Sequence, residues 1–184
     1  MGMLSHAEEA TPPCRSLGEY VRLLLREVER HDPLARARIA AVVERRRAWI
    51  TLDAETVEVS LRNGRLSVRK PVSRAPSGEG RTSRVCTLDL LDAHIEVTEA
   101  VLSGALELTG SLDDVTRMSM AIEVLIDASA RIPAMRRLAD DFRNDPCREA
   151  PEMPLHLFGH RVRLGLTASS AAELSLLERL GLLP

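Results

Sequence analysis

The stretch TVEVSLRNGRLSVR, residues 56–69, restricts the fold more than any other part of the sequence. Asn63 and Gly64 are a preferred pair for a two-residue type I′ turn, which joins two antiparallel strands. With Arg62 opposite Arg65, the apolar residues of both strands share one face. They are Val59, Leu61, Leu66 and Val68. A one-residue shift would turn them to the other face, so the turn and the hydrophobic pattern predict the same hairpin.

Two helices and a strand are expected before the hairpin. Ser16 and Glu19 have the spacing of a capping box, in which each side chain satisfies a backbone N–H at the start of a helix. Asp32-Pro33 restarts the helix, because proline suits the first helical position. The stretch WITLD at residues 49–53 then favours a strand.

The segment after the hairpin is expected to form a loop, a strand and a helix. Residues 71–84 are rich in Pro, Ser and Gly, which is typical of a mobile loop. Residues 85–90 (VCTLDL) predict a strand, and residues 92–104 predict a helix that Gly104 ends. On that helix, His94 falls within the apolar stripe.

A short strand between two helices is expected within AVLSGALELTGSLDD, residues 100–114. Residues 105–109 alternate apolar and polar side chains, and a glycine stands near each end of this segment. Ser111 is expected to cap a long helix, with two aspartates favourable to its dipole. Pro133 should kink or restart this helix, which ends near Arg143. A further short strand (158–164) and helix (170–180) are expected in the tail.

The chain length of 184 residues suits one domain with appendages. We expect a flexible leader over 1–15, a domain over 16–143, and a linker with a helical tail over 144–184. The sequence has no run of about 18 apolar residues, as a membrane-spanning helix would need. Its acidic N-terminus lacks the apolar core of a signal peptide. We therefore expect a cytoplasmic protein.

Several classes of function are disfavoured by the composition. The three cysteines, Cys14, Cys86 and Cys147, are far apart, which favours reduced thiols over a disulfide framework and disfavours a structural zinc site. A net charge of −2 and only four aromatic residues disfavour nucleic-acid binding. No known catalytic motif is present. We expect no cofactor and no metal.

The order of these elements resembles the sterol carrier protein type 2 family over about residues 35–142. VSLRNGRLSV looks like the central hairpin of that family. A second set of residues resembles the segment in which the family's members end one helix, form a short strand and begin a long helix. That set is Val101, Leu102, Gly104, Leu106, Leu108, Gly110 and Leu112. The resemblance implies an α+β fold: a curved, mostly antiparallel five-stranded sheet, covered on one face by helices. It also implies an apolar tunnel between the two layers.

A protein of this kind would bind a hydrophobic, lipid-like small molecule, such as a sterol, a fatty acyl chain or a polyketide or terpenoid, as carrier or presenter. The expected tunnel-lining residues lie on strands and on the long helix. They are Leu61, Leu66, Val68, Leu88, Leu90, Met118, Ile122, Leu125 and Ile126. The other interpretation of the same residues is an ordinary core packed to native density.

Two further hypotheses stay open. The first is an enzyme, a cyclase or isomerase of a hydrophobic natural product, with His94 and either Asp89 or Asp92 transferring protons in a dry pocket. The second is an interaction module that dimerises through the N-terminal helices and the tail. The expected partners are thus a hydrophobic ligand, a second copy of the chain and, transiently, a membrane surface.

Overall fold

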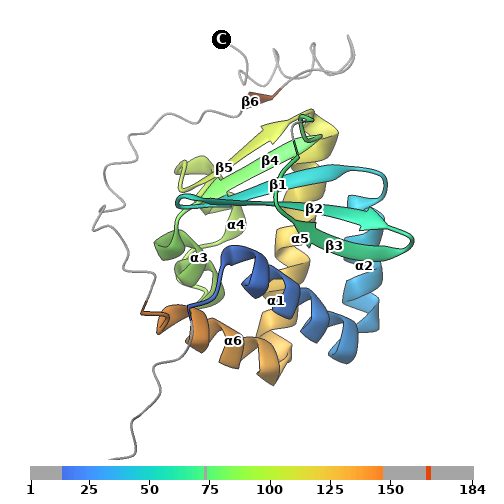
Figure 1. The fold of residues 1–184 in the computed structure, drawn as a ribbon. Helices are drawn as coiled ribbons and strands as arrows, with labels where there is room; N and C mark the ends of the chain where they lie inside the picture. The colour runs from blue at the N-terminus through green and yellow to red at the C-terminus, as the bar shows by residue number, and fades with distance from the viewer. Residues whose placement is uncertain (1–13, 73, 147–164, 167–184) are drawn as a thin grey trace, which may run out of the picture.

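The computed structural model describes residues 14–72, 74–146 and 165–166 of the chain. In this part of the chain a mixed sheet has its helices gathered against one face (Figure 1). Its strands are β1 (Arg47–Leu52), β2 (Glu55–Arg62), β3 (Arg65–Arg69), β4 (Gly78–Thr82), β5 (Leu106–Gly110) and the two-residue β6 (Gly165–Leu166). The helices are α1 (Leu17–His31), α2 (Pro33–Val43), α3 (Arg84–Leu91), α4 (Val97–Leu102), α5 (Leu112–Arg131) and α6 (Pro133–Arg143).

The strands lie in the order β3-β2-β1-β4-β5-β6. The pairs β1–β2, β2–β3 and β4–β5 are antiparallel, whereas β1–β4 and β5–β6 are parallel. The expected α+β fold with helices on one face is confirmed. The sheet is mixed because the chain crosses from the edge strand β3 to the centre before it forms β4, and β6 adds two residues beyond the five expected strands.

The hairpin of β2 and β3 has the predicted register. Leu61 pairs with Leu66, and Val59 pairs with Val68. The turn residues Asn63 and Gly64 have positive φ angles of 49° and 73°, as a type I′ turn requires. The hairpin therefore presents its apolar face to the helices.

The helix boundaries that rest on capping are also confirmed. Ser16 and Glu19 form the full capping box of α1, and Asp32 accepts a hydrogen bond from the N–H of Ala35 at the start of α2. Ser111 caps α5, and Pro133 begins a separate helix, α6. In each capped case a local side chain satisfies a backbone group that the helix leaves unpaired.

The strand expected over residues 85–90 is wrong, because these residues lie in helix α3. Ser83 accepts a hydrogen bond from the N–H of Cys86 and caps the helix, which buries Cys86 and Leu90 four positions apart. A short apolar run fits a strand or a buried helix equally well. The leucines Leu88 and Leu90, expected as tunnel-lining residues on a strand, therefore come from a helix.

The missing strand lies inside the segment expected as a loop. Strand β4 has the sequence GEGRT and pairs with β1 on one side and β5 on the other. Its backbone hydrogen bonds to two neighbours hold it in the sheet, so it needs no apolar side chains. Composition alone therefore predicted the wrong state for residues 78–82.

The helix expected over residues 92–104 is shorter in the structure. Only residues 97–102 form α4, and Ala93 has a φ angle of 58°. A left-handed residue cannot continue a right-handed helix, so residues 92–96 form a turn between α3 and α4.

The cysteines differ from one another. Cys86 is a free, buried thiol, as expected, whereas Cys14 is disulfide-bonded and the expectation of a reduced thiol there is wrong. The next residue, Arg15, forms an ion pair of 2.6 Å with Asp141, and its N–H donates to Asp145 at 3.4 Å. The start of α1 is thus held against the end of α6, a proximity that cysteine spacing in the sequence does not reveal.

Three groups of buried apolar side chains form the core. The β5 cluster contains Cys86, Leu90, Val97, Ala100, Ala105, Leu106, Leu108 and Val115. The β2 cluster contains Leu17, Tyr20, Leu52, Val57, Val59, Val68 and Phe142. The α2 cluster contains Val28, Ala35, Ile39, Ala128, Ile132 and Met135. Among the described residues, no helix has both the length and the apolar character needed to cross a membrane. The expected tail elements at 158–164 and 170–180 lie outside the described residues.

Candidate functional site

The central strand β4 has two glycines on the helix-facing side of the sheet. In the sheet register Gly80 lies between Ile50 of β1 and Leu108 of β5, and Gly78 lies between Ala48 and Gly110. Because side chains alternate between the two faces of a strand, Glu79 and Arg81 project from the opposite face. At Gly78 and Gly80 strand β4 therefore presents only hydrogen atoms to the helices, and Thr82 is its one residue with a side chain on this face.

This strand coincides with a division of the core. Ile50 packs against the β2 cluster, and Leu108 belongs to the β5 cluster. Gly80, directly between them, supplies no side chain to join the two. A domain usually has one contiguous core. We call the helix-facing surface formed by Ile50, Gly80 and Leu108 the Gly80 surface.

The two glycines differ in how closely they are covered. A Cβ atom placed on Gly78 would lie 3.0 Å from Cε and 3.1 Å from Sδ of Met118, so α5 closes over this residue. A Cβ atom on Gly80 would meet Cδ2 of Leu108 at 3.4 Å and, in the described part of the chain, no other non-neighbouring atom within 4 Å. Protein interiors are close-packed, so the room above Gly80 is unusual for a position facing the helices.

The middle of helix α5 is only partly buried. It begins beside β5 and runs towards α6 (Figure 1). Its fully buried residues are confined to its two ends: Val115 near the start, and Ala128 and Ser129 near the end. The apolar residues between them are only partly buried. They are Met118, Ile122, Val124, Leu125 and Ile126.

The expected tunnel-lining residues are divided among the clusters. Leu90, Met118, Ile122 and Ile126 join or pack against the β5 cluster. Val68 and Leu88 lie in or against the β2 cluster, and Leu66 and Leu125 pack against the α2 cluster. Leu61 is partly buried and pairs with Leu66. The structure thus gathers four of the nine around β5 and places the others along the rest of the helix-facing side.

Sequence reasoning missed the residues of the Gly80 surface. Ile50, Gly80 and Leu108 were not among the expected lining residues, because residues 78–82 were interpreted as part of a loop. The pattern GEGRT carries a usable signal: two glycines two positions apart alternate with charged residues. In a strand this alternation places both glycines on one face.

His94 does not lie in the apolar stripe, so that prediction is wrong. Its side chain is 71% exposed, and its Nδ1 is 3.7 Å from Oδ1 of Asp89. Asp92 instead pairs with Arg143 at 2.6 Å. The left-handed Ala93 turns the chain at this point. The groups proposed for proton transfer therefore lie at the surface and not in a dry pocket.

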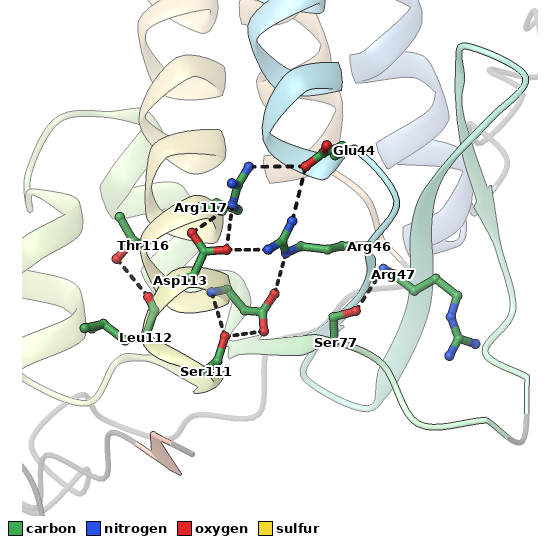
Figure 2. A network of polar contacts seen from close by, with 10 residues as sticks. Glu44, Arg46, Arg47, Ser77, Ser111, Leu112, Asp113, Thr116 and Arg117 are labelled. Carbon is green, nitrogen blue, oxygen red and sulfur yellow. Dashed lines mark hydrogen bonds and ion pairs between the residues drawn. The ribbon is translucent and has the colours of Figure 1, made fainter. Parts of the chain in front are cut away.

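A network of charged side chains holds the start of α5 (Figure 2). Nε of Arg46 donates to Asp114 at 2.7 Å, and its other nitrogens pair with Asp113 and Glu44. Arg117 pairs with Asp113 and Glu44 as well. The hydrogen bond with Asp114 raises the pKa of Arg46. The network ties α5 to the turn between α2 and β1, outside the apolar layer.

The opposite face of the sheet carries a buried ion pair. Glu58 is fully buried, and Arg69 donates to its Oε1 from Nε at 2.9 Å and from Nη2 at 2.6 Å. Burial raises the pKa of Glu58, but the hydrogen bonds and charge of Arg69 outweigh this effect and hold it below its ordinary value. Arg47 approaches the second oxygen at 3.8 Å. Charged groups thus lie on the face away from the helices.

Comparison with known proteins adds the following findings. The sequence matches no protein-family model, and no curated protein is significantly similar to it. Among solved structures, the ubiquinone synthesis protein UbiJ-SCP2 is 17% identical, with a TM-score of 0.46 over 61% of this chain and 88% of that one. The sterol carrier protein domain 2 of Helicoverpa armigera is 12% identical, with a TM-score of 0.46 over 59% and 87%.

A third solved structure is a conserved hypothetical protein of Thermus thermophilus, described as possibly a sterol carrier protein. It is 14% identical, with a TM-score of 0.43 over 65% of this chain and 86% of that one. These descriptions name the family that the residue pattern of this chain resembles.

Proposed function

We propose that this protein binds a hydrophobic, lipid-like small molecule between the Gly80 surface and the middle of α5, as its carrier or presenter. The observation that carries the proposal is the room above Gly80, at the line where the β2 and β5 clusters divide. The partly buried apolar residues of α5 support it, because a guest molecule would cover them.

The driving force would be removal of apolar surface from water. Burial of about 300 Å² of ligand surface contributes about 7.5 kcal/mol at about 25 cal/mol per Å², before the cost of association. A sterol, a long acyl chain or a polyketide or terpenoid offers surface of this order. The nine expected lining residues belong to this proposal, together with Ile50, Gly80 and Leu108.

The first test asks whether the protein retains a ligand. Native mass spectrometry of the mildly purified chain should show an added mass that organic extraction removes. The extracted protein should then take up a neutral apolar fluorescent probe, such as N-phenyl-1-naphthylamine, with saturable binding.

The second test fills the site. Gly80→Leu should lower probe affinity at least tenfold, because leucine would occupy the space above the strand. Arg81→Leu is the matched control: its side chain is 59% exposed and projects from the opposite face of the same strand. Equal binding by wild type and a folded Gly80→Leu variant would refute the site.

Transient contact with a membrane surface and formation of a homodimer are further parts of the proposal. Sedimentation with lipid vesicles tests the first, and light scattering after size exclusion tests the second.

A further inference from the structure

We infer that the ligand is electrically neutral, an alcohol, ester, ketone or hydrocarbon rather than a carboxylate or a phosphate; this inference rests on the proposed function. The side chains around the proposed site are apolar on both sides. The sheet contributes Ile50, Leu106 and Leu108, and the helices contribute Leu90, Met118 and Ile122.

Three arginines that are buried or partly buried form their contacts outside this layer. Arg84 is only 8% exposed, but its Nη2 donates to the carbonyl oxygens of Phe142 at 2.8 Å and Arg143 at 2.6 Å, where it caps the end of α6. Arg46 pairs with the aspartates at the start of α5. Arg69 forms an ion pair with Glu58 on the opposite face of the sheet. Nη2 of Arg84 and the guanidinium groups of Arg46 and Arg69 are thus bound outside the apolar layer, whereas Nε of Arg84 is buried and has no hydrogen-bond partner in the described part of the chain.

The neutral polar groups of the layer are also satisfied. The Thr82 hydroxyl donates to the carbonyl of Ala105 at 3.1 Å, and the Ser129 hydroxyl donates to that of Ile126 at 2.7 Å. Burial raises the pKa of the Cys86 thiol, which therefore stays uncharged at neutral pH. A ligand carboxylate between the Gly80 surface and the middle of α5 would lose its water, and the side chains named around this site are uncharged.

Burial of an unpaired carboxylate costs far more than burial of an ester or a hydroxyl group. The site should therefore discriminate among molecules with the same chain according to head-group charge. A difference of at least tenfold in affinity corresponds to about 1.4 kcal/mol.

The test compares three molecules with one sixteen-carbon chain: hexadecanol, methyl palmitate and palmitate. Each displaces the neutral fluorescent probe from the full-length protein at pH 8. We expect the alcohol and the ester to bind at least tenfold more tightly than the carboxylate. The gap should shrink as the pH is lowered and the fatty acid becomes protonated, whereas displacement by the alcohol should not change.

Equal or tighter binding of palmitate at pH 8 would overturn the inference and leave the proposed function standing. If none of the three molecules displaces the probe, and native mass spectrometry finds no retained mass, the proposed function fails and this inference fails with it.

A charge introduced by mutation provides an independent check. Ile122→Arg places a cation one helical turn beyond Met118 and should shift the ratio of palmitate to hexadecanol affinity at least tenfold towards palmitate. Ile122→Gln, of similar polarity but neutral, should not. An unchanged ratio in a folded Ile122→Arg chain would count against the inference. If that variant does not fold, the pH dependence of the wild type decides.

Discussion

Two glycines on neighbouring strands of the same sheet should respond in opposite ways to an added methyl group. Gly80 has room for it, with Leu108 at 3.4 Å, and its φ angle is not positive. Gly110 has a φ angle of 145°, and a Cβ there would lie 3.0 Å from the carbonyl oxygen of Ser77. Whether glycine is required thus depends on the backbone angle and the neighbours of each position.

We predict that Gly80→Ala raises the free energy of unfolding by about 0.4–1 kcal/mol, because alanine reduces the freedom of the unfolded chain at a compatible position. Gly110→Ala should lower it by more than about 1 kcal/mol, because the angle and the space are both unfavourable. Urea denaturation of the two variants measures both effects. Destabilisation by Gly80→Ala would mean that the space above Gly80 is filled.

Glu58 is a fully buried carboxylate on strand β2. We predict that Arg69→Met destabilises the protein by about 3 kcal/mol, because removal of one partner leaves a buried carboxylate unpaired. Arg65→Met, on the same strand at an exposed position, should change stability by less than about 0.5 kcal/mol. Similar denaturation midpoints for the two variants would show that the Glu58 pair is not structural.

The same pair predicts a dependence on pH. The pKa of Glu58 is lowered on folding, so its contribution is fully present above the pKa of the unfolded chain, about 4.3. The contribution is lost as the pH falls through the lower pKa of the folded state. Urea denaturation between pH 6 and pH 3 should therefore show a steeper loss of stability for wild type than for Glu58→Gln. Parallel curves would contradict this assignment.

At the scale of elements, α5 is fixed to the rest of the fold at its first turn. Arg46 joins Asp113 and Asp114 of α5 to Glu44, at the end of α2. The side chain of Arg46 is 31% exposed, so solvent weakens these ion pairs. The network therefore positions α5 more than it stabilises the whole molecule.

We predict that Arg46→Met lowers the free energy of unfolding by only about 1 kcal/mol but speeds amide hydrogen exchange in the first turn of α5. Exchange near Ala128, which is fully buried, should stay slow. Arg45→Met, the exposed neighbour, is the control. Uniform acceleration along α5 would show that the network supports the whole helix and not its start.

The predictions made for elements succeeded at the hairpin and at the caps of α1, α2 and α5. They failed for α3, although Ser83 caps it locally, and for β4, where pairing decides. The hairpin and the caps of α1, α2 and α5 depend on residues a few positions apart, so the sequence reveals them. Strand β4 depends on β1 and β5, whose paired residues lie up to 32 positions away along the chain. Its glycines and charged residues carry no strand propensity of their own.

At the scale of the whole molecule, a ligand that binds only the folded state must stabilise it. At a free ligand concentration one hundred times the dissociation constant, the gain is about 2.7 kcal/mol. Hexadecanol should therefore raise the melting temperature of wild type, with a smaller or no effect on Gly80→Leu. An equal rise in both variants would place the ligand elsewhere on the molecule.

For this protein, the sequence by itself determined the hairpin register and the starts of α1, α2, α5 and α6, because turn residues, caps and prolines act over a few residues. The α+β class followed from the family resemblance of the element order. The nine expected lining residues lie within, or pack beside, the apolar layer between the sheet and the helices. Their division among three clusters could not be foreseen. Nor could the disulfide at Cys14, the exposed position of His94 or the place of Gly78 and Gly80 at the centre of the sheet. These depend on which distant segments become neighbours, and only tertiary packing decides that.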